Sequence, residues 1–216
     1  MKRIRSPIDL ANVVQYIVLA NVVIYAIQIL MQPKTGLDED LFSLFNLHFL
    51  TWFERQFGLV TPIAIPNVIW QVFTSMFLHG GVWHIAMNMF LLWQFGHALE
   101  RVWGGMYFFK YYMFTGLGSS IAVILLAYVT NDVSITIGAS GAVFGVLLAY
   151  GMLFPNNILL MFFAIPMPAK YAVMIFGGIE LLLLLTGGLP GISHIGHLGG
   201  LLAGFLMLKG RGLLKL

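Results

Sequence analysis

The chain has 216 residues, 60% of them hydrophobic and 9% charged, with a formal net charge of +3. Soluble domains carry about 25% charged residues, so this composition excludes a soluble globular protein. It indicates an integral membrane protein, with a mean hydropathy of +0.92. The chain contains no cysteine, which excludes disulfide bonds, a thiol nucleophile and thiolate metal ligands.

Six apolar stretches, each long enough or nearly long enough to cross a bilayer, follow one another along the chain. The first comes after the basic start of the chain and is too long for the apolar core of a signal peptide, so we expect a retained first span. The predicted spans are residues 12–31, 81–99, 106–129, 140–154, 171–186 and 193–208. They predict an all-α polytopic membrane protein in which residues 1–216 form a single membrane domain.

The first loop, residues 32–80, is long and rich in aromatic side chains, including Phe42, Phe45, Trp52 and Trp70. Aromatic side chains favour the boundary between lipid and water. We therefore expect this loop to lie at the membrane interface.

The basic residues are distributed unevenly between the two sides of the membrane. With six spans, both chain ends lie on one side, together with the second–third and fourth–fifth connections. That side carries Lys2, Arg3, Arg5, Arg101, Lys110, Lys170, Lys209, Arg211 and Lys215, and the other side carries only Lys34 and Arg55. Positive charge gathers on the cytoplasmic side of membrane proteins, so both termini are predicted to be cytoplasmic, in a bacterial inner membrane.

Four polar residues from three different spans are predicted to lie at a similar depth. Spans two, four and six all begin on the outer side, and the polar residues near these beginnings are His84, Asn88, Ser140 and His197. Polar side chains inside a membrane are costly and tend to mark function. Their agreement in depth points to one shared site.

The fourth span is shorter than a bilayer. Residues 140–154 form a helix of about 22 Å at 1.5 Å per residue, against a hydrocarbon core of roughly 30 Å. The start of this span must then lie inside the membrane, reached by the irregular stretch 131–139. Irregular backbone at that depth is tolerated where it lines a wet cavity, so Ser140 is expected at the floor of a water-filled hollow open to the outer side.

Small residues spaced four apart predict that spans four and six pack closely. These pairs are Gly141 with Gly145 and Gly200 with Gly204. Ser140 directly precedes the first pair, and His197 lies about one turn before the second. If the two glycine faces meet, the hydroxyl and the imidazole come within reach of each other. Taken alone, the stretch around Ser140 favours the simpler interpretation, a small residue that lets helices pack.

These residue types can perform nucleophilic chemistry. A serine becomes a nucleophile when a base takes its proton, and histidine is the usual base near neutral pH. Ser140 and His197 could form such a pair, and His84 with Asn88 could donate hydrogen bonds to a developing oxyanion. We expect no Asp or Glu at the same depth, so the pair is predicted to be a dyad. Glu180, near the middle of span five, is interpreted as a protonated or hydrogen-bonded packing residue, with a proton-linked role as the alternative.

Four motifs, which occur along the chain in the family's order and are specific when taken together, resemble the rhomboid family of intramembrane serine proteases over residues from about 70 to 206. They are Gly138-Ala-Ser-Gly141, His84-Ile-Ala-Met-Asn88, His197-Leu-Gly-Gly-Leu-Leu-Ala-Gly204 and Glu100-Arg-Val-Trp-Gly104. The resemblance implies a six-helix core that hydrolyses peptide bonds in or next to transmembrane segments of single-span or polytopic membrane proteins in the lipid bilayer. It implies no metal, no cofactor and no nucleic-acid partner, and it leaves the oligomeric state open.

The resemblance also implies roles for individual residues. Ser140 is implied as the nucleophile and His197 as the general base, with an oxyanion hole made by the Ser140 backbone N–H, His84 and Asn88. The residues implied to support this site are Gly138, Gly141, Phe144, Gly200 and Gly204.

Two positions depart from the family pattern. Gln71 follows Trp70 where many members have arginine, which leaves the anchoring of the first loop open. Phe144 stands where tyrosine is frequent. Its ring can still pack against His197, but a hydroxyl contact is lost.

Other histidines and two other functions stay open as alternatives. His194 is the rival base, although the Leu-Gly-Gly sequence that fits the family follows His197. His79, in the outer loop, is expected to make a structural hydrogen bond. The alternative functions are a rhomboid-like protein that binds membrane segments without cleaving them and a haem-binding electron carrier, since paired histidines on membrane helices can ligate haem.

Overall fold

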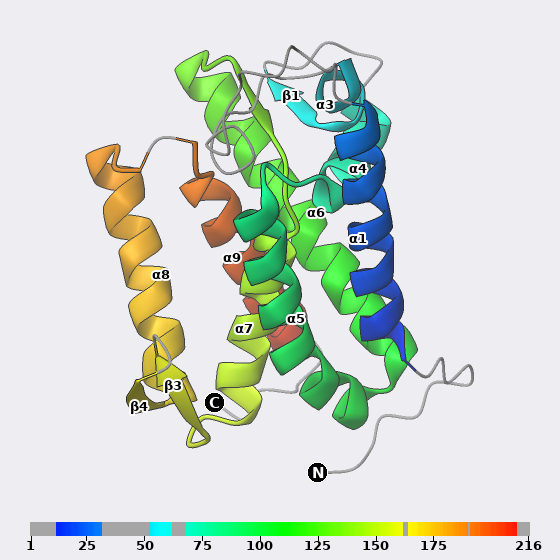
Figure 1. The fold of residues 1–216 in the computed structure, drawn as a ribbon. Helices are drawn as coiled ribbons and strands as arrows, with labels where there is room; N and C mark the ends of the chain where they lie inside the picture. The colour runs from blue at the N-terminus through cyan, green and yellow to red at the C-terminus, as the bar shows by residue number, and fades with distance from the viewer. Residues whose placement is uncertain (1–11, 32–51, 62–67, 162–163, 190, 211–216) are drawn as a thin grey trace.

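A computed structural model of the chain describes residues 12–31, 52–61, 68–161, 164–189 and 191–210. Most of these residues are helical, and long helices occupy the six ranges predicted as spans (Figure 1). The long helices are α1 (Val13–Met31), α5 (Val82–Trp103), α6 (Gly105–Thr130), α7 (Ser140–Leu153), α8 (Ala169–Thr186) and α9 (His194–Gly210).

The composition and length of the helices fit an integral membrane protein. α1, α6 and α8 are each long and apolar enough to cross a membrane, and α7 is a shorter apolar helix of 14 residues. A 14-residue helix is about 21 Å long, less than the hydrocarbon core of roughly 30 Å. The number of six membrane crossings stays a prediction.

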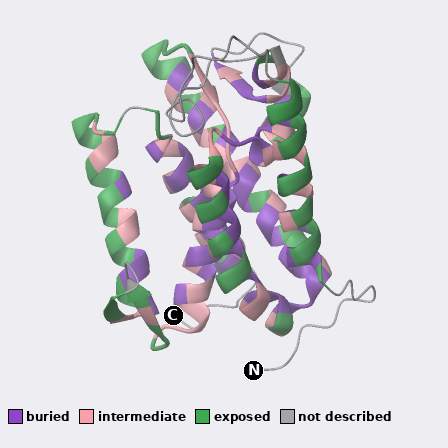
Figure 2. Cartoon of the chain, in the orientation of Figure 1, coloured by how far each residue is buried: buried purple, intermediate pink, exposed green. Residues whose placement is uncertain are grey.

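Helices α6, α7 and α9 pack against one another at the centre of the bundle, where buried residues concentrate (Figure 2). Glycines allow this approach, because their backbones touch. A Cβ atom on Gly200 of α9 would overlap the carbonyl of Gly141 on α7. A Cβ on Gly199 would lie 2.9 Å from the carbonyl oxygen of Gly118 on α6. The small-residue spacing therefore places three backbones in contact.

The described part of the first loop is structured. It contains α3 (Trp52–Phe57), β1 (Leu59–Thr61), α4 (Val68–Thr74) and the 3-10 helix η1 (Ser75–Phe77). Residues 32–51 and 62–67, which include the predicted interfacial residues Phe42 and Phe45, lie outside the described residues.

Gln71 of α4 ties these pieces of the first loop together. Its side-chain oxygen accepts a hydrogen bond from the N–H of Val60 at 3.2 Å. Its amide nitrogen donates to the carbonyls of Arg55 at 3.1 Å and Gln56 at 3.2 Å. The Trp70 ring nitrogen also donates to Gln56, at 2.9 Å. An amide offers both donors and an acceptor, so Gln71 anchors the loop without a positive charge.

The chain is mostly helical, and two short sheets that the all-α prediction did not include accompany the helices. β1 pairs antiparallel with β2 (Ser134–Thr136), with Leu59 opposite Thr136. β3 (Ile158–Met161) pairs antiparallel with β4 (Ile165–Pro168) in the connection before α8. Two-stranded sheets leave each strand one unpaired edge, where prolines such as those of β4 need no N–H donor. Strands of three or four residues are too short to give a periodic sequence signal.

Buried polar contacts fix both ends of α1. At its start, the carboxylate of Glu100 accepts hydrogen bonds from the N–H groups of Val13 at 2.6 Å and Val14 at 3.3 Å. Near its end, the Gln28 side chain accepts from the His79 N–H at 2.9 Å and donates to the His79 carbonyl at 3.3 Å. Glu100 therefore caps a helix, in the position where an acid stabilises the free N–H groups.

Candidate active site

Ser140 is the first residue of α7, and the backbone before it is held from two sides. β2 pairs with β1, and the N–H of Gly138 donates to the carbonyl of Ser75 at 2.9 Å. Gly138 has φ +130°, a conformation that is essentially restricted to glycine. The first loop therefore fixes the sharp turn that presents the Ser140 side chain at the start of the helix.

The Ser140 hydroxyl oxygen lies 2.8 Å from Nε2 of His197 on α9. The close packing of α7 on α9, with Gly141 against Gly200, brings the two side chains together. The ring of Phe144, one turn after Ser140, stacks on the His197 imidazole with centroids 4.3 Å apart and planes 12° apart. A buried imidazole with a ring stacked on its face keeps one orientation, directed at the hydroxyl.

His84 and Asn88 lie on α5 beside the turn before Ser140. The N–H of Gly80 donates to Nδ1 of His84 at 3.2 Å, so the neutral imidazole carries its proton on Nε2. A Cβ atom on Gly138 would lie 2.8 Å from that Nε2, which places the His84 ring directly against the turn. The amide nitrogen of Asn88 donates to the carbonyl of His84 at 2.9 Å. An amide nitrogen has a second N–H.

The backbone at the start of α7 adds further donors. The N–H of Val143 donates to the Ala139 carbonyl at 3.0 Å. The three N–H groups before it, including that of Ser140, have no acceptor within the helix. Such groups at a helix start favour negative charge nearby. Nε2 of His84 and these N–H groups therefore flank the same turn.

The structure overturns the expectation that no acid lies at the depth of the two residues. The Oε1 atom of Glu180 lies 3.0 Å from Nδ1 of His197, and its Oε2 atom lies 2.7 Å from Nδ1 of His194. Glu180 is six residues before the end of α8, about 9 Å, and His197 is three residues after the start of α9, about 4.5 Å. The long side chain of Glu180 covers the remaining difference in depth between Glu180 and His197. An acid in an apolar span near two histidines was the available signal.

Glu180, His194 and His197 are also the group that could hold a metal ion, among the residues that the structure describes. One ligand atom from each lies within 4.8 Å of the other two. Their nitrogen and oxygen atoms already face one another or neighbouring protein groups, since Nε2 of His194 lies 2.8 Å from the carbonyl oxygen of Gly188. The predicted absence of a metal stays a prediction.

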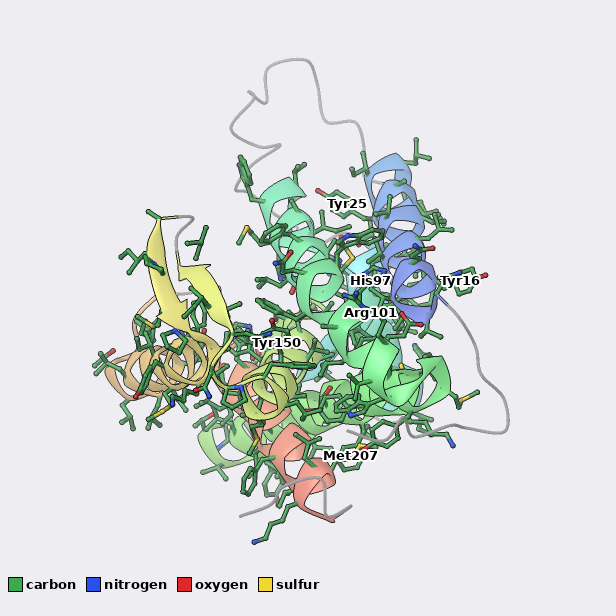
Figure 3. All side chains as sticks on the ribbon, turned by 90° about the horizontal axis from the view of Figure 1, so that it is seen from below. Tyr16, Tyr25, His97, Arg101, Tyr150 and Met207 are labelled. Atoms are coloured by element: carbon green, nitrogen blue, oxygen red, sulfur yellow. The ribbon has the colours of Figure 1, made fainter. Side chains whose placement is uncertain are left out.

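The remaining histidines take structural positions in the described regions. The His79 backbone bonds to Gln28, and its fully buried ring lies edge-on to that of His84, with centroids 5.1 Å apart. Burial, together with the nearby His84, lowers the pKa of His79 to about 3. His97 contacts the carbonyl of Trp93 at 2.9 Å and lies next to Arg101 in the second half of α5 (Figure 3).

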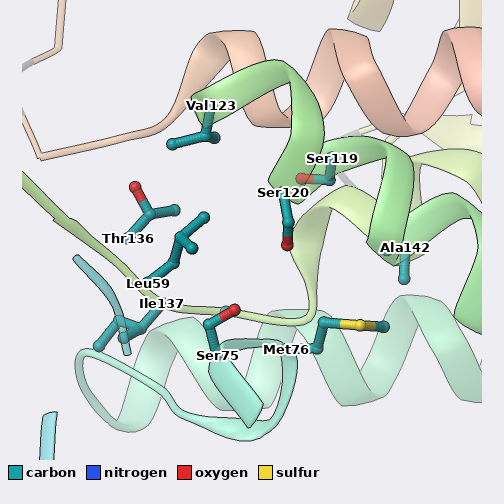
Figure 4. A pocket seen from close by; sticks show the side chains of 11 residues that line it. Leu59, Ser75, Met76, Ser119, Ser120, Val123, Thr136, Ile137 and Ala142 are labelled. Atoms are coloured by element: carbon teal, nitrogen blue, oxygen red, sulfur yellow. The ribbon is translucent and has the colours of Figure 1, made fainter. Parts of the chain in front are cut away.

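A small pocket lies behind the Ser140 turn (Figure 4). Its volume is about 10 Å³, roughly the space that one water molecule requires. Hydroxyl groups contribute much of the lining, and they belong to Ser75, Ser119, Ser120 and Thr136. Gly138 and Ala142 also line the pocket, so these hydroxyl-bearing residues lie close to the turn that presents Ser140.

Comparisons with known proteins agree on one family. The Rhomboid domain family matches residues 66–211. The chain is 35% identical over 155 residues to RHOMBOID-like protein 1 of Arabidopsis thaliana. The matched region covers 68% of this chain and 36% of that protein. It is 32% identical over 140 residues to Rhomboid protein 1, mitochondrial, of Saccharomyces cerevisiae (63% of this chain and 40% of that protein).

One bacterial relative is named as a protease. The chain is 31% identical over 150 residues to Rhomboid protease GluP of Bacillus subtilis (strain 168), which covers 68% of this chain and 27% of that protein. The chain therefore spans less than half the length of these three curated relatives.

Proposed function

Because the chain belongs to the rhomboid family, to which residues 66–211 match, we propose that it is an intramembrane serine endopeptidase. It hydrolyses peptide bonds in or next to transmembrane segments of other membrane proteins. The observation that carries this proposal is the 2.8 Å contact between the Ser140 hydroxyl and Nε2 of His197. A relative named as a protease supports it.

In the proposed reaction, Ser140 is the nucleophile and His197 is the general base. The Ser140 oxygen forms a bond to the scissile carbonyl carbon as its proton moves to Nε2 of His197. When the C–N bond breaks, the same nitrogen gives that proton to the leaving amine. Water then hydrolyses the ester through the same proton transfers. The distance of 2.8 Å suits direct transfer.

The proposed oxyanion hole consists of the Ser140 backbone N–H, His84 and Asn88. The tautomer of His84 leaves an N–H on Nε2, beside Gly138. Asn88 has a second amide hydrogen besides the one that bonds to His84. Donors fixed before the reaction stabilise the developing charge without reorganisation. In this role, Gly138 is required because its own backbone must pass close to His84.

The proposed membrane arrangement has six spans with both termini on the cytoplasmic side and the site in a water-filled cavity below the outer surface. The partial exposure of Ser140 and the short length of α7 support access of water from that side. Substrates would enter from the lipid near α8 and the first loop. Their cleavage site would be locally unwound, with small residues near the scissile bond. A bacterial inner membrane stays our prediction for the location.

The two alternatives make different predictions. A silent rhomboid-like binding protein would retain membrane segments without cutting them. A haem carrier would need imidazole nitrogens directed at an iron atom, whereas the nitrogens of His197 face Ser140 and Glu180. A haem absorption band in the purified protein that is lost in His84→Ala would support the carrier.

The decisive experiment measures cleavage of a single-span reporter protein in liposomes. Ser140→Ala should reduce the rate at least ~10³-fold, as removal of a serine nucleophile does. Ser120→Ala is the matched control, because this buried serine of α6 donates to the Val72 carbonyl at 3.0 Å and has no proposed role in the reaction. It should keep cleaving. Full cleavage by the Ser140 variant would overturn the proposal.

A second pair of variants separates the two candidate bases. His197→Ala should abolish cleavage, because the proton of Ser140 then has no acceptor. His194→Ala should leave a measurable rate, since His194 contacts Glu180 and Gly188 rather than Ser140. Equal loss of activity in both variants would remove the assignment of His197 as the base.

A further inference from the structure

Glu180 is the unusual buried residue of α8. The other buried residues of this helix are Ala169, Ala172 and Val173, all in its first turns. Glu180 is 9% exposed and lies in the second half of the helix, where its carboxylate is directed at α9. An acid inside a membrane span is costly unless it is paired, so its two histidine contacts need a chemical account.

The hydrogen bonds of His194 define its own role. Both of its ring nitrogens face acceptors, the Oε2 atom of Glu180 at 2.7 Å and the Gly188 carbonyl at 2.8 Å. A carbonyl only accepts, so Nε2 of His194 must donate to Gly188. The proton between Nδ1 and Glu180 then makes this pair either two ions or two neutral groups, with no net charge in both cases. His194 therefore fixes the Glu180 carboxylate in place.

The second carboxylate oxygen faces the proposed base. Oε1 of Glu180 lies 3.0 Å from Nδ1 of His197, at ion-pair distance but not aligned as a hydrogen bond. Nε2 on the opposite side of the same ring lies 2.8 Å from Ser140. A nearby carboxylate favours the tautomer with the proton on Nδ1. That tautomer presents the lone pair of Nε2 to the serine proton.

We propose that Glu180 is a positioning residue that acts through His197, and that His194 holds Glu180 in the geometry this requires. This inference rests on the proposed function and replaces the expected dyad with a chain of Ser140, His197, Glu180 and His194. Glu180 sets the tautomer of His197 and stabilises the imidazolium that forms when Ser140 loses its proton. An acid behind a catalytic histidine acts in this way in soluble serine proteases.

Among the residues that the structure describes, the ionisable groups that face His197 are Glu180 of α8 and His194 of α9. From α7, the Ser140 hydroxyl contacts Nε2 and the Phe144 ring stacks on one face of the imidazole. An oxygen of Glu180 therefore lies next to the positive charge that His197 acquires in the reaction. Without it, His194 and His197 would be two basic rings 6.5 Å apart with no acid between them.

The test compares the wild type with Glu180→Gln, which keeps the shape of the side chain and removes its charge. We expect kcat to fall by roughly 10²-fold or more, up to the ~10⁴-fold seen when the acid of a Ser-His-Asp triad becomes an amide, with KM little changed. The acid limb of the pH profile of kcat/KM should move to lower pH, since the carboxylate no longer favours the protonated imidazole. Glu180→Asp, which keeps the charge, should restore part of the rate.

Glu100→Gln is the matched control, because Glu100 is also a buried carboxylate but caps α1 away from the site. It should lower the temperature of unfolding and leave the pH profile unchanged. If Glu180→Gln behaves in the same way, Glu180 only attaches α8 to α9 and the inference is overturned. One bound zinc per chain that is lost in Glu180→Gln would also overturn it, since the cluster would then be a metal site.

A spectroscopic measurement keeps this test independent of cleavage. Nitrogen-15 NMR of the histidine rings, with the His197 signals assigned from His197→Gln, should show the proton on Nδ1 in the wild type. It should show a mixture of tautomers in Glu180→Gln. Unchanged His197 signals would overturn the inference even if cleavage depends on Ser140. Cleavage that survives Ser140→Ala would instead overturn the proposed function, so the two failures can be told apart.

Discussion

Helices α7 and α8 hold their parts of the site in contrasting ways. Eight of the 14 residues of α7 are buried, against four of the 18 residues of α8. α7 touches α6 and α9 through backbone atoms at glycines, whereas a Cβ on Gly178 of α8 would meet nothing within 4 Å. The distance between Ser140 and His197 is thus set by close packing, and the carboxylate comes from a helix held mainly at its first turns and at Glu180.

This difference indicates how the tolerance to substitution should vary around the site. Interiors packed at high density transmit small displacements, so changes at the contact between α7 and α9 should alter the Ser140–His197 distance directly. Changes on the exposed face of α8 should leave it unaltered.

The largest effect is expected from Gly200→Ala. The added Cβ would overlap the carbonyl of Gly141, which is backbone and cannot rotate away. α7 and α9 must then separate, so cleavage should fall to background. The cost should reach or exceed the ~1–3 kcal/mol typical of overpacking. Cleavage of the reporter and thermal unfolding in detergent measure both effects. A variant that keeps the parent activity would contradict the close contact of α7 and α9.

The next effect is expected from Gly138→Ala. Its φ of +130° is strained for any other residue, and the Cβ would lie 2.8 Å from two atoms of the His84 ring. The strain should cost about 1–3 kcal/mol, and displacement of His84 should reduce kcat more than it raises KM. Gly187→Ala is the control, with φ +66° at the end of α8 and nothing within 4 Å of its Cβ. It should carry a backbone cost and keep its kcat.

A third prediction concerns the loss of stability at acid pH that arises from His79, whose backbone bonds to Gln28 near the end of α1. The fully buried His79 has its pKa lowered to about 3, whereas an unfolded histidine has a pKa near 6.5. The unfolded chain therefore binds the proton first, and the free energy of unfolding should fall as the pH drops below about 6.5. The loss should approach 2 kcal/mol at about pH 5, at 1.36 kcal/mol per unit. Urea unfolding of wild type and His79→Gln measures it. An equal acid sensitivity in both would contradict this origin.

The smallest effect is expected from Gly178→Ala, the counterpart of Gly200→Ala on the loosely packed helix. No atom lies within 4 Å of the added Cβ, and alanine is the better helix former. Stability should rise by up to about 1 kcal/mol, and the cleavage rate should stay that of the parent chain. A loss of stability and cleavage as large as that of Gly200→Ala would contradict the open space around Gly178.

The sequence predicted the ranges of the long helices because apolar length and breakers such as Pro155 define them. It also suggested that Ser140 and His197 approach each other, since glycines four residues apart determine which helix faces meet. Both inferences depend on residues that are close together in the sequence, so they can be made without knowing the fold.

Other features depend on contacts between distant residues and were missed. The contact between Glu180 and His197 was missed because the position of a residue along its span gives the depth of its Cα atom and not that of the end of a long side chain. The pairing of β1 with β2 joins residues more than seventy positions apart through strands of three residues. Gln71 anchors the first loop through three backbone groups, and such partners cannot be read from residue type.

The strand pairing before Ser140 also bears on where the functional unit begins. The family match starts at residue 66, but β1 ends at Thr61 and supplies the backbone partners of Ser134–Thr136. A chain shortened to residues 66–211 would remove the strand partners of those half-buried N–H and C=O groups, close to Ser140. It would also remove α1, whose first N–H groups Glu100 binds. The smallest active fragment should therefore start upstream of α1.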